Sequence, residues 1–254
     1  MAAPDCGVTL RWAWNEVSSQ WISWARAPGH DSYWQFHRDA FLSLVPAASG
    51  VTLDIGCGEG RLSRDLTALG HTVVGLDASF SLASAAAHHP DLATQALVAD
   101  AAALPMRPSV IDAAVAFMSP QDIDEFETAI AEAARVLRPR GRLVLALVHP
   151  LNSAGKFTDV DGRTRFVISD SYFERRRLAD DVNRDGLAMT FHSEHRPLQA
   201  YTDAIADAGL LIERVVEVRE PDPSDKWHRV PLFLHLRAVK PSSTEGQASF
   251  HDDL

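Results

Sequence analysis

The sequence has few of the residues on which several protein classes depend. Its only two cysteines, Cys6 and Cys57, cannot build a disulfide framework or a zinc site, and no metal is expected. A reducing compartment such as the cytoplasm fits this usage. No apolar run reaches the roughly 20 residues needed to cross a bilayer, and the N-terminus lacks the pattern of a secretion signal. These absences favour a soluble, cytoplasmic protein.

Basic charge is also scarce. Lysine and arginine total 24 against 34 aspartate and glutamate residues, giving a formal net charge of −10. Because binding to a phosphate backbone needs a basic surface, nucleic acid is not expected as the main partner. The one compact basic run, residues 175–177, is interpreted as a solvated helix face.

The part of the chain from about residue 50 alternates between short apolar strands and helices. Strands are expected at residues 51–55, 71–76, 96–99, 110–117 and 142–148, with helices at 60–69, 79–88 and 123–137. Such alternation implies right-handed crossovers and a mostly parallel sheet. A further helix at 197–208 precedes strands at 210–218 and 230–239, whose short connection requires an antiparallel pair.

Two unusual segments accompany this alternation. Five of the six tryptophans lie within the first 50 residues, and Trp14, Trp21 and Trp24 share one helix face, typical of a helical cap with its own core. Residues 150–196 are polar and broken by glycines, which indicates a lid inserted after the fifth strand. The expected organisation is a cap at 1–48, a domain at 49–240 that contains the lid, and a disordered tail at 241–254.

A glycine-rich turn, residues 54–60 (Asp-Ile-Gly-Cys-Gly-Glu-Gly), joins the first strand to its helix. Glycines let a backbone approach a ligand closely, and the helix start offers free N–H groups. A dinucleotide-binding loop would have its third glycine at position 61, which is Arg61 here. The carboxylate of Asp54 is awkward for a pyrophosphate and suits a ligand with an ammonium or sulfonium group.

Acidic residues follow the next two strands as well. Asp77 ends the second strand, where a carboxylate can accept hydrogen bonds from both hydroxyls of a ribose. Asp100 follows the third strand and is placed to accept from an exocyclic adenine amine. For Asp100 the alternative is the N-cap of a helix.

Residues 53–60, 74–77, 99–100 and 137–143 together resemble the successive motifs of class I S-adenosylmethionine (SAM)-dependent methyltransferases. The resemblance is to the small-molecule type, similar to the ubiquinone and menaquinone biosynthesis enzymes, and covers roughly residues 50–150. It implies an α/β, Rossmann-like fold with a seven-stranded, mostly parallel sheet whose last strand is antiparallel. It also implies SAM as cofactor and S-adenosylhomocysteine as product.

The resemblance assigns the cofactor site to the glycine loop, the acidic strand ends and the residues after the fourth strand. The implied cofactor-binding residues are Asp54, Gly56, Cys57, Gly58, Asp77, Ala78, Asp100, Ala101, Phe117 and Met118. Related enzymes cover the cofactor with N-terminal helices, so Tyr33 is added to this set. Trp34 and His37 from the same segment, and Tyr172 and Phe173 from the lid, are candidates for the acceptor pocket.

Histidines are the candidates for a general base, which methyl transfer needs only when the acceptor is a weak acid. His149 directly follows the fifth strand, at the end of the sheet where ligands bind. His192 and His195 lie where the lid returns to the sheet, in a His-Arg-Pro segment expected to pack against the active site. The alternative for each is a structural histidine bonded to nearby backbone.

The favoured function is methyl transfer from SAM to a small organic acceptor, such as a biosynthetic or natural-product intermediate. A lid of this length suits an enclosed small molecule rather than a macromolecule. Three alternatives remain open: a cyclase or decarboxylase on the same fold, a non-catalytic SAM-binding protein, and an RNA or protein methyltransferase. No membrane or nucleic-acid partner is expected, and a homodimer through the N-terminal helices is left open.

Overall fold

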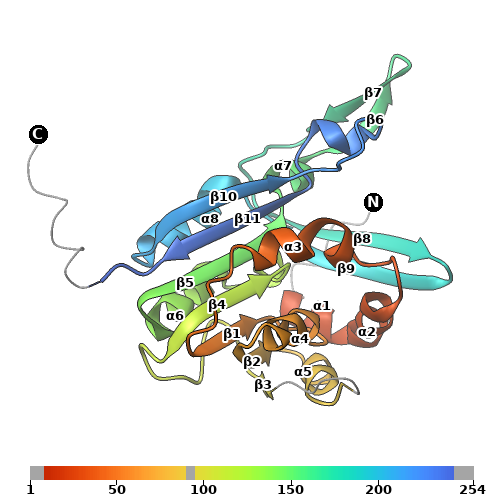
Figure 1. The fold of residues 1–254 in the computed structure, drawn as a ribbon. Coiled ribbons are helices and arrows are strands. Elements are labelled where there is room, and N and C mark those ends of the chain that lie inside the picture. The colour runs from red at the N-terminus through yellow and green to blue at the C-terminus, as the bar shows by residue number, and fades with distance from the viewer. Residues whose placement is uncertain (1–8, 90–94, 243–254) are drawn as a thin grey trace, which may run out of the picture.

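The computed structural model describes residues 9–89 and 95–242 and is built around one seven-stranded sheet (Figure 1). The strands run in the order β10-β11-β5-β4-β1-β2-β3. Their bounds are β1 (Val51–Ile55), β2 (Thr72–Asp77), β3 (Gln95–Val98), β4 (Ile111–Phe117), β5 (Leu137–Val148), β10 (Leu211–Val218) and β11 (Phe233–Val239). Only the β11 pairings are antiparallel, on both sides, which confirms the predicted sheet.

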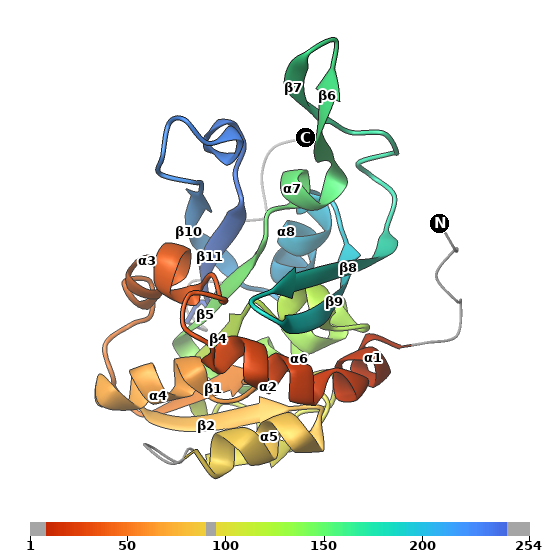
Figure 2. The same cartoon turned by 90° about the vertical axis from the view of Figure 1, so that its right-hand side faces the viewer.

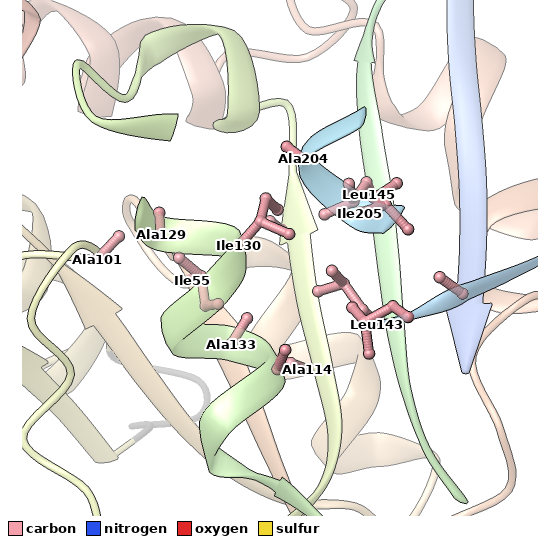
Figure 3. Close-up of a cluster of buried hydrophobic side chains, with 14 of the residues drawn as sticks. Ile55, Ala101, Ala114, Ala129, Ile130, Ala133, Leu143, Leu145, Ala204 and Ile205 are labelled. Carbon is pink, nitrogen blue, oxygen red and sulfur yellow. The ribbon is translucent and has the colours of Figure 1, made fainter. Parts of the chain in front are cut away.

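Helices cover both faces of this sheet. They are α4 (Arg61–Ala68), α5 (Phe80–Ala87), α6 (Phe126–Val136) and α8 (Leu198–Asp207), each within a few residues of its predicted span. Figure 3 shows the main apolar cluster, in which Ile130 of α6 and Ile205 of α8 pack against Leu143 and Leu145 of β5. The apolar face of α6 repeats at the three- and four-residue spacing of an amphipathic helix, which fixes it on the sheet.

The N-terminal segment forms four short helices. They are α1 (Leu10–Glu16), α2 (Ser18–Arg26), η1 (Tyr33–His37) and α3 (Arg38–Leu42). The single tryptophan-bearing helix expected from the spacing is thus two helices that meet at Val17. Helices α1 and α2 lie between α5 and the hairpin of residues 176–195, across the carboxyl edge of the sheet (Figure 2).

The polar insertion at residues 150–196 is ordered into one short helix and two hairpins. After α7 (Pro150–Ala154), β6 (Lys156–Val160) pairs with β7 (Arg163–Val167), and β8 (Arg176–Arg184) pairs with β9 (Leu187–His195). Each hairpin turns at an Asp-Gly pair with positive φ, 53° and 69° at residues 161–162 and 51° and 80° at 185–186. These angles suit the tight two-residue turn that Asp-Gly favours.

The expected helix face at residues 175–177 is wrong, because Arg176 and Arg177 begin the strand β8. Side chains alternate between the two faces of a strand, so the two guanidinium groups point to different partners. Residues 243–254, where most of the disordered tail was predicted, lie outside the described residues. In the described ranges, no helix is both long and apolar enough to cross a membrane.

Candidate active site

A cavity of about 1120 Å³ opens at the carboxyl ends of the parallel strands. Its walls come from the glycine loop, the segments after β2 to β5, the helices α1 and α2, and the lid. Ligands of open α/β sheets bind at this edge. The volume is at the upper end of the range of small-molecule sites, so there is room for more than one ligand.

The glycine loop forms the floor of the cavity beneath α2. Gly56, Gly58 and Gly60 have φ values of 70°, 57° and 88°, which only glycine adopts without strain. A Cβ on Gly56 would lie 2.4 Å from Cβ of Ser119, and one on Gly58 would lie 3.2 Å from Nε1 of Trp21. The loop therefore needs glycine both for its conformation and for the closeness of its neighbours.

Two buried carboxylates stand beside the glycine loop. Asp54 accepts a hydrogen bond of 2.6 Å from the Ser63 hydroxyl, and Asp77 accepts from the backbone N–H groups of Gly58 at 2.9 Å and Ser79 at 2.8 Å. Burial raises the pKa of each carboxyl group to about 6. Because a carboxylate has about four lone-pair sites, both groups keep acceptor capacity for a ligand that brings donors or positive charge.

Helix α1 is tied to the cofactor side of the cavity by polar contacts. Arg11 lies 3.5 Å from the half-exposed carboxylate of Asp100, which also accepts from the N–H of Ala102 at 2.9 Å. The Ser79 hydroxyl donates to the Asn15 side chain at 3.1 Å. These contacts hold α1 over the ends of β2 and β3, where the ribose and adenine were predicted to lie.

Arg61, noted in the sequence only as a missing glycine, is a buried cation in the cavity wall. Its guanidinium pairs with Asp31 and lies over the rings of Tyr33, Phe117 and Trp21, 4.7 to 5.6 Å from their centroids. Its Nε is buried and has no hydrogen-bond partner among the described residues. The side chain is thus a second link between the N-terminal segment and the glycine loop.

The tryptophans of α1 and α2 form one wall of the cavity. Trp14, Trp21 and Trp24 surround Phe191 of β9 with ring centroids 6.0 to 6.4 Å away. All four rings line the cavity. The spacing of the tryptophans predicted a core for the cap alone, whereas in the structure these rings also form a surface of the cavity.

The segment after β4 carries polar groups that the sequence analysis passed over. Met118 has a φ of 53°, and the Ser119 hydroxyl donates to the carbonyl of Ile55 at 2.7 Å. Gln121 is 6% exposed and donates to the Met118 carbonyl, but its Oε1 is buried and has no partner among the described residues. Asp122 also lines the cavity, and burial raises the pKa of its carboxyl group well above the usual range.

The residues implied for the cofactor come together in the structure, with one exception. The cavity is lined by Asp54, Gly56, Cys57, Gly58, Asp77, Ala78, Asp100, Ala101, Phe117 and Met118. Tyr33 is fully buried behind Arg61 and does not reach the cavity; its hydroxyl donates to Asp65 at 2.6 Å. The individual ligand contacts stay predictions.

The histidines proposed as bases do not line the cavity. His149 caps α7: its Nδ1 accepts from the N–H of Leu151 at 3.0 Å, and its Nε2 lies 3.1 Å from Glu217. His195 is fully buried, with Nε2 2.9 Å from the Tyr172 carbonyl and Nδ1 2.7 Å from the Ser153 hydroxyl. Burial lowers the pKa of both imidazoles, and this geometry favours structural roles.

The remaining predicted residues also lie outside the cavity lining. His192 alternates with Phe191 and Ser193, which do line it, so its side chain faces the opposite side of the hairpin. His37 is buried against His235, and the Tyr172 hydroxyl accepts from the N–H of Leu198. Trp34 and Phe173 are 62% and 75% exposed. Their role in the acceptor pocket stays a prediction.

The His-Arg-Pro segment packs beneath the cavity, as expected. Arg196 is fully buried, pairs with Glu194, and donates to the carbonyls of Ile123 at 2.7 Å and Pro120 at 3.4 Å. Arg176 donates to the carbonyls of Ser153 and Ala154 at 3.0 and 3.1 Å. Arg196 therefore fastens the end of the lid to the segment after β4, and Arg176 ties β8 to α7 at the start of the lid.

Comparison with known proteins gives consistent matches over the strands and loops just described. Residues 53–145 match the family model described as a methyltransferase domain. Among curated proteins, the chain is 33% identical over 129 residues to a malonyl-[acyl-carrier protein] O-methyltransferase of Pectobacterium atrosepticum, covering 49% of this chain and 51% of the relative. It is 30% identical over 122 residues to a demethylmenaquinone methyltransferase of Thermobifida fusca, covering 46% and 50%.

The chain thus spans about half the length of the curated relatives it matches. A crystal structure of a putative SAM-dependent methyltransferase from Listeria monocytogenes shares the fold over a longer stretch. Its TM-score is 0.66 at 19% identity, and the match covers 80% of this chain and 97% of that one. The fold similarity therefore extends beyond the segment with detectable sequence similarity.

Proposed function

From the premise that residues 53–145 form a class I, SAM-dependent methyltransferase domain, we propose that the protein transfers a methyl group from SAM to a small organic acceptor. The observation that carries the proposal is the pair of buried carboxylates, Asp54 and Asp77, beside the glycine loop in one large cavity. The small acceptor is supported by the lid and the aromatic wall, which enclose the cavity above the loop.

The residues at the loop fit SAM chemically. Burial disfavours the charged form of both carboxylates, and a ligand with an ammonium, a sulfonium and two ribose hydroxyls would offset that cost. Asp54 and the glycines would hold the methionine part, Asp77 the ribose and Asp100 the adenine amine. Bound SAM supplies a methyl group on a positively charged sulfur, which is a good leaving group.

The protein's own contribution is to position the reactants and exclude water. Phe117 and Met118 form an apolar surface after β4, and Trp21 lies over Gly58 on the opposite side of the cavity. Holding a nucleophile in line with the methyl carbon can supply a large part of the rate enhancement, especially in a dry site. The hairpin β8–β9 and α2 enclose the cavity from above and so serve both purposes.

We test the proposal by calorimetric titration of SAM into the wild type and into Asp77→Ala. The wild type should bind, and the variant should lose about ten- to hundred-fold in affinity, as expected when a hydrogen bond to a charged group is removed. Asp203→Ala, at an exposed position on α8, is the matched control and should bind as the wild type does. A wild type that binds no SAM would refute the proposal.

Incubation with tritiated-methyl SAM and a panel of phenols, amines and carbon acids then separates transfer from other SAM-dependent reactions. Label in a small product supports methyl transfer. Binding without label in any product would favour a cyclase, a decarboxylase or a non-catalytic SAM-binding protein. A cytoplasmic location is also a proposal, which the cysteine-poor composition supports. A homodimer through the N-terminal helices is a further proposal.

A further inference from the structure

The half of the cavity over β4 and β5, away from the glycine loop, suits a ligand that carries several hydrogen-bond donors. Its larger polar donors are already used by backbone carbonyls. The Asn152 amide donates to the Leu232 carbonyl at 3.1 Å, and the guanidinium of Arg176 is bound to the carbonyls of Ser153, Ala154 and Ser171. Lys156 at the start of β6, in the arm that projects from the molecule (Figure 1), lines the cavity but is exposed.

Hydrogen-bond acceptors without a partner among the described residues also line this half of the cavity. Gln121 Oε1 is buried and receives no donor from any described residue. Its amide nitrogen is used by the Met118 carbonyl, and the Gln121 side chain also contacts the Asp122 carboxyl. A buried acceptor without a donor destabilises the protein, so a ligand that donates there gains affinity from satisfying it.

A third acceptor lies on the hairpin. Asp180 lines the cavity, and no hydrogen bond or ion pair to its side chain is found in the described part of the chain. Asp180 stands opposite Phe191 in the β8–β9 register, so its carboxylate lies beside the aromatic wall of Trp14, Trp21 and Trp24. Aromatic faces next to a carboxylate favour a cation.

We propose that the methyl acceptor is an amine whose nitrogen lies against Gln121 Oε1 and the Asp122 carboxylate, and that Asp122 takes its proton. This rests on the proposed function of the same cavity. An ammonium has the two or three N–H donors that the unpartnered acceptors lack, whereas a carboxylate or an ether has none. The apolar body of the amine would pack on the aromatic wall.

The chemical step balances with SAM as the only co-reactant. The ammonium gives one proton to the Asp122 carboxylate, and the freed lone pair of the nitrogen attacks the methyl carbon. The carbon–sulfur bond breaks with its electron pair remaining on sulfur. The positive charge therefore passes from the sulfonium to the methylated nitrogen.

The protonation of Asp122 is set by groups from three elements. Burial and the charge of Asp77 on β2 raise the pKa of Asp122, and the buried Arg196 that follows β9 and the Gln121 contact lower it. Only the carboxylate form can accept a proton, so amine methylation should rise with pH through the pKa of Asp122. That rise should be absent in Asp122→Asn.

A binding experiment tests the amine assignment without any need for turnover. Trp14, Trp21, Trp24 and Trp227 line the cavity, so their fluorescence reports its occupancy. Three probes that share a phenylethyl group, 2-phenylethylamine, 2-phenylethanol and 3-phenylpropanoate, are titrated at pH 7.5 with and without S-adenosylhomocysteine. The amine should bind at least ten-fold more tightly than either matched probe, and an alcohol or carboxylate that binds equally well overturns the proposal.

Two variants locate the contact. Asp122→Asn and Gln121→Met keep the side-chain shapes and should weaken amine binding about ten- to hundred-fold while leaving the alcohol unchanged. Asp203→Asn, at an exposed position on α8 outside the cavity lining, is the control and should have no effect. Unchanged amine affinity in both folded variants overturns the assignment. Failure of SAM binding is measured separately and bears on the methyltransferase proposal alone.

Discussion

At the scale of single residues, the site is distinguished by buried carboxylates that lie beside a cavity large enough for a ligand. Asp54 and Asp77 are almost fully buried, yet each has only part of its acceptor capacity satisfied by the protein. Burial without full compensation raises the pKa of both carboxyls to about 6. The incompletely satisfied carboxylates thus destabilise the ligand-free protein at this site and favour a ligand that brings positive charge and hydrogen-bond donors.

This arrangement predicts that SAM affinity depends on pH. Both pKa values are raised in the folded protein, so the carboxylates are lost as pH falls through about 6, and the affinity for SAM should fall with them. We expect at least a ten-fold increase in Kd between pH 7.5 and pH 5, measured by calorimetry. Constant affinity over this range would show that the two carboxylates do not face the cofactor.

The raised pKa values also make the free energy of unfolding of the SAM-free protein depend on pH, in the opposite direction to SAM affinity. A folded-state pKa of about 6 against a usual value of 3.8 means that the folded state binds more protons between these limits. The free energy of unfolding should therefore decrease as pH rises from about 4 to about 6. Denaturant titrations without SAM check this trend, and Asp54→Asn should flatten it.

Arg61 and Asp31 allow a second test at this scale. Their side chains are 11% and 6% exposed, so removing one partner leaves the other charge buried and unpaired. Arg61→Met should lower the free energy of unfolding by about 3–5 kcal/mol, and Asp31→Asn in the same chain should restore much of it. A double-mutant cycle by urea denaturation measures this coupling, and purely additive losses would contradict it.

The sequence predicted the acidic strand ends and the glycine loop because these residues are adjacent to strands whose place in the fold follows from alternation. It did not predict Gln121, Asp122 or Arg61, because their importance comes from burial and from the absence of partners, which only packing decides. Packing also decides the outcome for His149 and His195, which were predicted as bases. Their positions in the chain suit catalysis, but their ring nitrogens are bonded to nearby groups.

At the scale of elements, the hairpin β8–β9 ends in a turn that is held by exposed contacts. Its turn is held to the segment before η1 by Arg184, which donates to the Gly29 carbonyl at 2.7 Å, and by His30, which lies 3.1 Å from the Arg184 carbonyl. These exposed contacts link the two segments that enclose the cavity. Breaking them should loosen the lid without unfolding the domain.

Arg184→Ala should therefore increase amide hydrogen exchange in β8 and β9 while changing global stability by no more than about 1 kcal/mol. It should also raise the KM for the acceptor several-fold with little change in SAM affinity. Arg165→Ala, at an exposed position on the other hairpin, is the control and should alter neither quantity. Exchange that is unaffected by Arg184→Ala would show that the turn is held by other contacts.

The strands and helices of the sheet could be predicted from their hydrophobic patterns, but the two hairpins were read only as a polar insertion. Their strands alternate poorly, since β8 and β9 have a polar cavity face as well as a solvent face. The signal that could have found them is the Asp-Gly pair at residues 161–162 and again at 185–186, flanked in each case by residues of mixed polarity.

At the scale of the whole molecule, the N-terminal helices and the lid complete a cavity that the sheet alone would leave open. Helix α1 contacts the ends of β2 and β3 through Ser79 and Asp100, and α2 lies over the glycine loop through Trp21. Residues more than a hundred positions apart meet there, as in the hydrogen bond of 2.9 Å from the Trp14 indole to the His192 carbonyl. Neither segment could form the wall by itself.

The lid is also one unbroken stretch of chain, leaving the sheet after β5 and rejoining it before α8. Arg176 binds the carbonyls of Ser153 and Ala154 at the start of the lid, and Arg196 at its end binds the Ile123 carbonyl and pairs with Glu194. The β6–β7 hairpin lies between the carbonyls that Arg176 binds and Arg176 itself, so its sequence can change without loss of this anchor. An exchange of this hairpin, in evolution or by protein engineering, would change the acceptor side of the cavity and leave the cofactor-binding half unchanged.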